Sequence, residues 1–246
     1  MKTLFISDLH LSELRPDLTA AFIHFLEQEA PSAEALYILG DLFEFWIGDD
    51  ERSPLQLQVA EALAALNRRG TALYFIHGNR DFMIGKAFAR ASGMTLLPSV
   101  HPLALYGRQV VLLHGDLLCT LDEKYQRFRR ITAIGWLRWL FLRLPLSKRL
   151  EIAGRMRQGK QGKSLMLMDV TPEAVQALLE EHDASVMIHG HTHKPAVHPL
   201  DFAIQDRVSG LNQRAERIVL GDWDRSLSVL EASPDGLRLK SLPLQA

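Results

Sequence analysis

The sequence predicts a layered α/β fold into which a helical segment is inserted. Along the first half of the chain, short apolar runs typical of β-strands alternate with helix-like stretches, and more strand-like runs gather near the end. Between these parts lies a long basic segment with a helical pattern of its own. The chain has 246 residues, 47% of them apolar, which is enough for one large domain or two small ones.

The elements of the first half alternate in type. Strand-like runs read TLFISDLH, ALYILGDLFE, ALYFIHGNRD and RQVVLLHGD. Between the first two runs, Pro16 to Glu29 is helix-like, and a second helix is expected in SPLQLQVAEALAALNRRG, with Gly70 as its C-terminal stop. This alternation favours a sheet with covering helices.

After the basic segment, DVTPEAVQALLEEH predicts a helix with Thr171 as N-cap and Pro172 at its first position. A strand, SVMIHGHTH, follows. We expect RIVLGDWD, LSVLEA and LRLKSLPL to close the chain as antiparallel strands.

The basic segment divides the chain. From Asp122 to Lys163 there are twelve Lys or Arg residues against three Asp or Glu, a net charge of +9, whereas the whole chain carries −1. The segment is too long for a structureless loop. We therefore predict a core of residues 1–120 and 165–246 and an inserted helical lid of residues 121–164, placed over the active site of the core. The near-zero total charge gives no reason to expect a nucleic-acid partner. The positive charge of the lid, however, is suited to a negatively charged partner.

Other features concern the compartment. Cys119 is the single cysteine, so no intramolecular disulfide is possible and a reducing environment fits. The first residues, MKTLFISDLH, lack the apolar stretch of a signal peptide. No segment has the roughly 18 uninterrupted apolar residues that a membrane span needs. We expect a soluble cytoplasmic protein.

Polar side chains recur where the predicted strands end. In open α/β sheets, ligands gather beyond the carboxyl ends of the strands. Oxygen and nitrogen donors without sulfur suit hard or borderline divalent metals. The candidate metal ligands are Asp8, His10, Asp41, Asn79, His114, His191 and His193.

The spacing of these residues predicts how they share metal ions. In an extended segment, residues i and i+2 point the same way, so Asp8 and His10 can face one ion, and so can His191 and His193. The two oxygens of Asp41 can bridge two ions. Two such metals can activate water and stabilise an in-line displacement at phosphorus.

The motifs DLH, GDLFE, GNRD, LLHGD and GHTH, in this order, resemble the five blocks of the calcineurin-like metallophosphoesterases. The resemblance covers the chain outside the basic segment and implies a four-layer αββα sandwich. It implies one metal on Asp8, His10, Asp41 and His193. The second metal would be held by Asp41, Asn79, His114 and His191.

Arg80 departs from the family pattern, in which a histidine follows the asparagine of the third block. Arginine stays protonated and cannot act as general acid, but it can bind a phosphate bidentately. A phosphate leaving group needs no proton, so Arg80 favours cleavage of a phosphoanhydride. The alternative is a structural ion pair with Asp81 or Asp116.

Within the superfamily, GNRDF, DLFEFWIGDD, GHTHKPAVH and GDWD resemble the pyrophosphatases that cleave UDP-2,3-diacylglucosamine in lipid A synthesis. The resemblance implies water attack on the α-phosphorus, giving UMP and lipid X, with two Mn²⁺ ions as cofactors. Ligand type alone does not distinguish manganese from cobalt or magnesium. The catalytic residues implied are Asp8, His10, Asp41, Asn79, Arg80, His114 and His191. The substrate-binding residues implied are Asn79, Arg80, Asp122, Arg157, Lys160, Lys163 and His191.

The lid has the composition expected for a lipid substrate. Trp136, Trp139 and neighbouring Leu and Phe residues offer apolar area for acyl chains or for packing onto the core. The interleaved cations are suited to anionic lipid head groups, at roughly 1 kcal/mol per basic residue near a membrane surface. These cations are Arg129, Arg130, Arg138, Arg143, Lys148 and Arg149. We expect a monomer on an anionic membrane surface, peripheral on the cytoplasmic face of the bacterial inner membrane.

Two other functions remain open. A phosphodiesterase of soluble nucleotides would have the same metal site but no use for the apolar, basic lid. A metal-free binding scaffold would keep the fold without the chemistry, although such a protein usually lacks some ligands.

Overall fold

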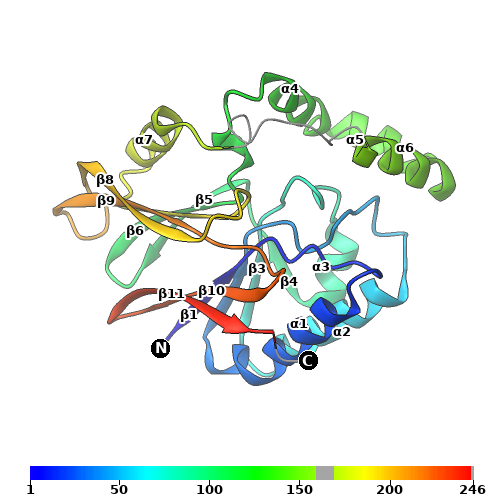
Figure 1. Cartoon of the computed structure of the whole chain (residues 1–246), viewed down its shortest axis with the longest axis horizontal. Helices are drawn as coiled ribbons and strands as arrows, with labels where there is room; N and C mark the ends of the chain where they lie inside the picture. The colour runs from blue at the N-terminus through cyan, green and yellow to red at the C-terminus, as the bar shows by residue number, and fades with distance from the viewer. Residues whose placement is uncertain (159–168, 245–246) are drawn as a thin grey trace.

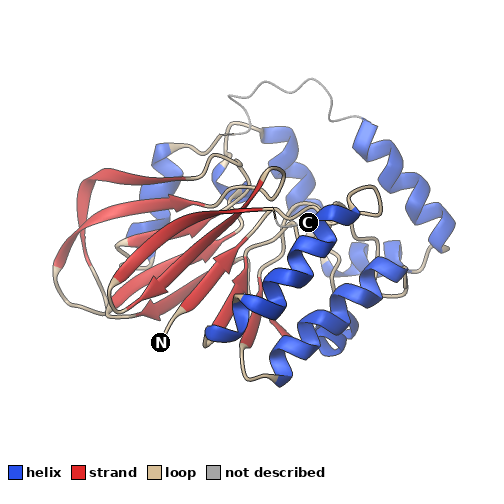
Figure 2. Ribbon diagram, turned by 60° about the horizontal axis from the view of Figure 1, so that its bottom comes forward, coloured by secondary structure: helices blue, strands red, loops and turns tan. Residues whose placement is uncertain are grey.

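The structure, a computed structural model, describes residues 1–158 and 169–244, and for residues 155–158 only the backbone. Two mixed β-sheets face each other, and helices cover their outer faces (Figure 1, Figure 2). The predicted α/β class and sandwich architecture are therefore confirmed.

The first sheet has the strand order β11-β10-β1-β2-β3-β4. Strands β1 to β4 run parallel to one another, and β10 runs antiparallel to both β1 and β11. In register across three neighbouring strands, Phe5 stacks on Tyr37 and Tyr37 on Tyr74. The strands span Thr3–Ile6 (β1), Ala35–Ile38 (β2), Ala72–Phe75 (β3), Met94–Leu96 (β4), Ser226–Ser233 (β10) and Gly236–Pro243 (β11).

The second sheet has the order β5-β6-β7-β9-β8. Its centre, β6-β7-β9, is parallel, whereas the edge strands β5 and β8 are antiparallel to their neighbours. The strands span Val100–Leu105 (β5), Arg108–Leu113 (β6), Val186–His189 (β7), Ala196–Gln205 (β8) and Asn212–Val219 (β9).

Three apolar layers hold the sandwich together. One lies between the first sheet and its helices and includes Phe22 and Leu63. The second lies between the two sheets and includes Ile188, and the third joins the second sheet to α7 through Leu179. Burial of apolar area in layers of this kind is the main favourable term in folding. The covering helices are α1 (Pro16–Gln28), α2 (Pro54–Arg68), α3 (Lys86–Ser92) and α7 (Pro172–Glu181), with short 3₁₀ turns η1 (Ala30–Ser32) and η2 (Asp116–Leu118).

The basic segment contains helices, as its pattern predicts. These are α4 (Glu123–Thr132), α5 (Gly135–Leu142) and α6 (Leu146–Gln158). Figure 1 shows them along one edge of the molecule, away from the strands. We refer to these three helices as the lid helices. The division into a core of residues 1–120 and 165–246 and a lid of residues 121–164 stays a prediction.

The closing strands depart from the sequence expectation in one respect. Strands β10 and β11 are antiparallel, as predicted. Strand β9, however, begins at Asn212 and ends at Val219, and it pairs in parallel with β7. Its antiparallel partner is β8, which follows the GHTH motif and which the sequence pattern did not predict. The GDWD residues therefore lie in the loop after a strand and not within one.

Candidate metal centre and adjoining cavity

Five strands deliver the predicted metal ligands to one place. Strands β1, β2 and β3 of the first sheet, and β6 and β7 of the second, all end at the same edge of the sandwich. The carboxyl ends of parallel strands lie together, so the loops that follow them converge. This explains why a hydrophobic strand runs directly into Asp8 and His10.

The first group comprises Asp8, His10 and His193, whose donor atoms all lie within 4.8 Å of one another. Asp8 Oδ1 lies 3.3 Å from His193 Nε2 and 3.9 Å from His10 Nε2. The Nε2 atoms of the two histidines are 3.4 Å apart. Side chains that are far apart in the sequence therefore converge on one small volume.

The second group is built around His114. Its Nε2 lies 3.2 Å from Asn79 Oδ1, 3.2 Å from His191 Nδ1 and 3.7 Å from Asp41 Oδ2. The same Asp41 oxygen lies 3.9 Å from His10 Nε2, in the first group. Asp41 thus stands between the two groups, in the position that the sequence predicts for a bridging carboxylate.

The donor set fits divalent cations. Asp8 Oδ1 is buried and, among the described residues, has no hydrogen-bond partner, although imidazole nitrogens face it. Buried polar atoms are normally satisfied, so a carboxylate oxygen in this setting suits a bound ion. His114 Nδ1 contacts the carbonyl oxygen of Leu39 at 2.8 Å, which directs its Nε2 toward the cluster.

The backbone at the site is held in an uncommon conformation. Non-glycine residues with positive φ are rare because their Cβ crowds the carbonyl group, and they concentrate at functional sites. Here the left-handed region contains five of the predicted ligands, with φ from 50° to 69°: Asp8, His10, Asp41, His191 and His193. The surrounding structure therefore fixes these side chains at a conformational cost.

Two glycines allow the loops to approach so closely. A Cβ on Gly78 would overlap Oδ1 of Asp41, and a Cβ on Gly190 would overlap Ser7 Oγ. Glycine is the residue that permits this approach. The Gly-Asn and Gly-His steps of the motifs are therefore steric requirements of the cluster.

Burial and charge act in opposite directions on the histidines. Burial would lower the pKa of His114, but the negative charges of Asp41, Asp8 and Asp116 raise it to about 9. Burial would also lower the pKa of His193, but its contacts with Asp222 and Asp8 raise it to about 10. For His191, burial and the nearby His114 lower the pKa to about 4. The carboxylates of the cluster therefore favour positive charge close to them.

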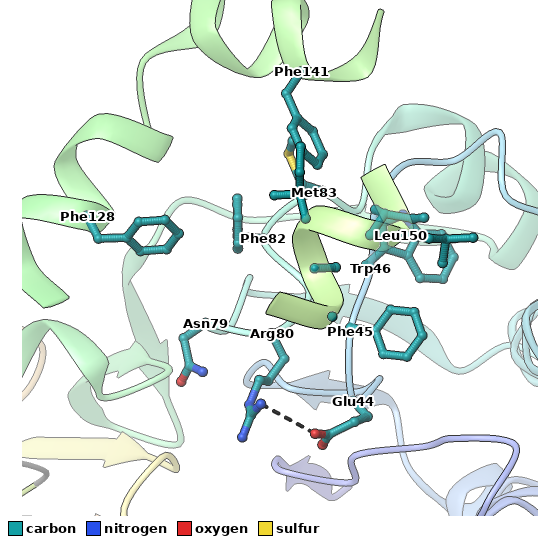
Figure 3. A pocket seen from close by; sticks show the side chains of 14 residues that line it. Glu44, Phe45, Trp46, Asn79, Arg80, Phe82, Met83, Phe128, Phe141 and Leu150 are labelled. Carbon is teal, nitrogen blue, oxygen red and sulfur yellow. Dashed lines mark ion pairs between the residues drawn. The ribbon is translucent and has the colours of Figure 1, made fainter. Parts of the chain in front are cut away.

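A cavity of about 260 Å³ adjoins the cluster (Figure 3). Asn79, Arg80 and Glu44 supply polar groups to its lining, and the rest is apolar. The apolar residues come from the loops after β2 and β3 and from all three lid helices. They are Phe45, Trp46, Ile47, Phe82, Met83, Phe128, Phe141, Leu150, Ile152, Ala153 and Gly154. The cavity therefore connects the metal cluster to the lid.

Arg80 has a partner that the sequence did not indicate. Its Nη1 lies 3.3 Å from Glu44 Oε1. The two carboxylates considered as alternatives are engaged elsewhere: Asp81 accepts backbone hydrogen bonds from Leu42 and Gly78, and Asp116 pairs with Arg129. Arg80 thus lines the cavity beside Asn79 instead of bracing these two residues.

The structure describes the side chain of one predicted substrate-binding residue of the lid but not those of the other three. Asp122 is the N-cap of α4, where its side chain accepts a hydrogen bond from the Tyr125 backbone at 3.0 Å. The side chains of Arg157, Lys160 and Lys163 lie outside the described residues. Their substrate contacts therefore stay predictions.

Three of the cationic side chains of the lid make hydrogen bonds or ion pairs within the protein. Arg149 is only 2% exposed and donates to Asp50, Ile47 and Leu144, which contradicts its expected role at a lipid head group. Arg129 pairs with Asp116, and Arg138 donates to the Phe82 carbonyl. A cation pattern in the sequence does not reveal which side chains fold inward.

The apolar side chains of the lid are partly exposed. Trp136 is 65% exposed and Trp139 56%, and Arg143 lies over the Trp139 ring at 4.5 Å from its centroid. Phe141 points instead into the cavity (Figure 3). In the described part of the chain, no helix combines the length and apolar character that crossing a membrane requires.

Sequence reasoning did not connect three carboxylates with support of the cluster. Glu44 lies 3.1 Å from His10 Nδ1, and Asp222 lies 3.2 Å from His193 Nδ1. Asp81 is buried and joins the loops after β2 and β3 through backbone hydrogen bonds. All three lie inside quoted motifs, GDLFE, GDWD and GNRD, which is the signal that could have drawn attention to them.

The two facing sheets, with carboxylates, imidazoles and an amide where their strands end, define a metallophosphoesterase. The family described as calcineurin-like phosphoesterase matches residues 1–195, and the chain belongs to it. Near full-length relatives bear a more specific name, UDP-2,3-diacylglucosamine hydrolase. The relative from Tolumonas auensis is 58% identical over 248 residues, covering 99% of this chain and 98% of its own. The relative from Serratia proteamaculans is 51% identical over 247 residues, covering 99% of this chain and 100% of its own.

Proposed function

We propose that this protein hydrolyses UDP-2,3-diacylglucosamine to UMP and 2,3-diacylglucosamine 1-phosphate (lipid X), a step of lipid A biosynthesis. The observation that carries the proposal is the apolar cavity that opens beside Asn79 and Arg80, next to the metal cluster. A diacylated nucleotide sugar has acyl chains for such a cavity and a pyrophosphate for the cluster. The name of the near full-length relatives supports the same substrate.

Two Mn²⁺ ions are the proposed cofactors. Asp8, His10, Asp41 and His193 would hold one, and Asp41, Asn79, His114 and His191 the other. When bound, such ions would supply Lewis-acid activation of water and of the phosphoryl oxygens. The donor types also accept other divalent metals, so the preference for manganese is part of the proposal.

The chain's own residues position the pyrophosphate. Arg80 offers several N–H donors at the cavity wall, and Asn79 lies beside it, which supports the proposal that both contact phosphoryl oxygens. We assign His191 to the same task from the cluster side. Water attacks the α-phosphorus, the bond to the bridging oxygen breaks, and lipid X leaves as a phosphate. That leaving group needs no general acid, which is consistent with Arg80 at this position.

The lid is proposed to serve both the substrate and the membrane. Phe141 and Leu150 line the cavity and would contact acyl chains. Trp136 and Trp139 face outward and would contact a lipid surface, where amphipathic helices with Trp and basic residues associate. We place the enzyme on the cytoplasmic face of the bacterial inner membrane, as a peripheral protein and a monomer.

The alternatives explain less of the molecule. A phosphodiesterase of soluble nucleotides would leave the apolar cavity without an occupant. A metal-free scaffold would not require the strained backbone that brings the predicted ligands together.

The test compares substrates that differ only in lipid content. Purified protein in detergent micelles with Mn²⁺ is given UDP-2,3-diacylglucosamine or UDP-N-acetylglucosamine, and UMP release is measured. Burial of each acyl CH₂ contributes about 0.8 kcal/mol, so we expect a preference of at least about 100-fold in kcat/KM for the lipid substrate. Equal rates on both substrates would favour the soluble-nucleotide alternative, and turnover unaffected by a metal chelator would contradict the metal site.

A further inference from the structure

We propose that Glu44 is a positioning residue that connects a metal-ligand histidine to the phosphate-binding arginine, so that one side chain tunes both metal affinity and substrate binding. The inference rests on the proposed function, because it concerns the same cluster and the same cavity. It concerns a residue of the GDLFE motif that is not itself a predicted ligand.

The two oxygens of Glu44 face different partners. Oε2 lies 3.1 Å from His10 Nδ1. Oε1 lies 3.3 Å from Arg80 Nη1, the ion pair marked in Figure 3. The side chain of Glu44 is 18% exposed, that of His10 19% and that of Arg80 30%. A pair this far from solvent is screened much less than a surface ion pair.

Backbone hydrogen bonds hold the three loops around Glu44. The Glu44 amide donates to the Leu11 carbonyl at 3.1 Å, which joins the loop after β2 to the loop after β1. The Trp46 amide donates to the Arg80 carbonyl at 3.1 Å, which joins it to the loop after β3. These backbone bonds fix the Glu44 backbone between the loops that carry His10 and Arg80.

Toward His10, the carboxylate acts on the tautomer. A carboxylate beside Nδ1 favours the proton on that nitrogen and leaves the lone pair on Nε2, which faces Asp8 and Asp41. The contact is at ion-pair distance and is not aligned as a hydrogen bond. Loss of such a partner typically costs 10- to 100-fold in metal affinity.

Toward Arg80, the carboxylate restrains a long side chain. A guanidinium has five N–H donors, which is more than one carboxylate can accept, so an Arg80 whose Nη1 faces Glu44 Oε1 still offers donors to phosphoryl oxygens. Restricting the side chain before substrate binds reduces the entropy lost on binding. Glu44 thereby links the position of Arg80 to that of His10.

Asp222 provides a matched comparison. Its Oδ2 lies 3.2 Å from Nδ1 of His193, a predicted ligand in the same group as His10. Asp222 thus has the same relation to a metal-ligand histidine as Glu44, but it lies in the loop after β9, beyond the second sheet. Removal of its charge is expected to affect metal binding alone.

The experiment uses the variants Glu44→Gln and Asp222→Asn in the full-length protein. Glutamine keeps the size of the side chain but presents a single acceptor oxygen, so it cannot serve both partners. Mn²⁺ affinity is measured by calorimetry without substrate, and KM for UDP-2,3-diacylglucosamine is measured at saturating Mn²⁺. We expect about 10-fold weaker manganese binding in both variants. We expect KM to rise about 5- to 10-fold in Glu44→Gln only, because this variant loses roughly one charge-assisted contact.

A double-mutant cycle tests the link to Arg80. Arg80→Ala is expected to raise KM by itself. Adding Glu44→Gln to it is expected to change KM by less than about 2-fold, because the shared contact is already gone. Circular dichroism and thermal unfolding check that each variant is folded.

Each of the two proposed links of Glu44, to His10 and to Arg80, has an experimental outcome that would refute it. Unchanged manganese affinity in folded Glu44→Gln refutes the link to His10. A full additional rise in KM when Glu44→Gln is combined with Arg80→Ala refutes the link to Arg80. If the wild type does not hydrolyse UDP-2,3-diacylglucosamine, the proposed function fails separately, and the substrate-free manganese arm still decides whether Glu44 supports the cluster.

Discussion

At the scale of single residues, the site depends on positions where only one residue type fits. Gly78 approaches Asp41 so closely that a Cβ there would overlap the carboxylate and the Asp41 backbone nitrogen. Asp41 lies between the two ligand groups. The motif glycines are therefore part of the metal site even though they provide no ligand.

Gly78→Ala is expected to weaken manganese binding by at least about 10-fold and to lower the free energy of unfolding by roughly 1–3 kcal/mol, the usual cost of overpacking. Calorimetry and urea unfolding measure the two effects. Gly135→Ala is the control, because a Cβ there meets nothing within 4 Å. Equal behaviour of the two variants would show that the close approach does not matter.

The sequence predicted the ligands because each ends a strand in a motif of fixed order. It did not predict the supporting contacts, which form between loops. Glu44 faces His10 and Arg80 only because three loops meet, and Asp222 reaches His193 from beyond β9. Residue patterns within one strand do not contain such information.

At the scale of elements, the apolar strands β1, β2, β3, β6 and β7 were predicted, as were β10 and the edge strand β11. The other edge strands, β4, β5 and β8, were missed. Strand β8 alternates between exposed and half-buried residues and contains Pro199, so its apolar signal is weak. Thr171 occupies the N-cap of α7 as predicted, but its hydroxyl contacts Leu118 and Thr120 and not the helix. Tertiary contacts therefore override the local capping signal.

Arg149 anchors helix α6 to the core. Arg149 donates to the Ile47 carbonyl at 2.7 Å and to Leu144 at 3.0 Å, and it pairs with Asp50 in the loop after β2. We expect Arg149→Ala to lower the free energy of unfolding by about 2 kcal/mol, from the loss of buried hydrogen bonds. Chemical unfolding measures this, with Lys148→Ala, 65% exposed, as the control. A loss no larger than that of the control would argue against the anchor.

The turn between β8 and β9 depends on a buried carboxylate. Burial would raise the pKa of Asp206, but hydrogen bonds from Ser185 and from the Ser209, Gln109 and Val208 backbone amides lower it overall. Because the folded pKa lies below the unfolded value of about 3.9, the carboxylate stabilises the fold above that pH, and this is lost as pH falls through the folded pKa.

Asp206→Asn turns an amide N–H toward these donors and should lower the free energy of unfolding at pH 7 by about 1–3 kcal/mol. The difference from the wild type should shrink below about pH 4. Urea unfolding of the metal-free protein at pH 7 and below about pH 4 measures this difference in unfolding free energy. Asp201→Asn is the control, because Asp201 is exposed. A pH-independent difference would contradict the charge-based explanation.

At the scale of the whole molecule, the metal cluster, the apolar cavity and the exposed tryptophans lie in a series from the core through the lid helices. The cluster and the cavity share Asn79, and the cavity shares α5 with the outward-facing tryptophans. This series of a polar cluster, an apolar cavity and exposed tryptophans suits a substrate that has a polar end and a lipid end.

Trp136→Ser combined with Trp139→Ser is expected to weaken binding to vesicles containing anionic lipid by at least about 10-fold, because each aromatic ring loses apolar burial. Co-sedimentation measures the binding, and raised salt should weaken it in the wild type. Leu211→Ser is the control, because Leu211, like Trp136, is 65% exposed but lies in the β8–β9 turn. Unchanged binding of the double variant would show that the two tryptophans do not contact the membrane.

The most direct test of the central claim is hydrolysis of UDP-2,3-diacylglucosamine in oxygen-18 water with Mn²⁺, followed by mass spectrometry of both products. The proposed function predicts that the label appears in UMP, because water attacks the α-phosphorus and lipid X leaves. Label in lipid X would move the attack to the other phosphorus and contradict the proposed orientation of the substrate between Arg80 and the cluster.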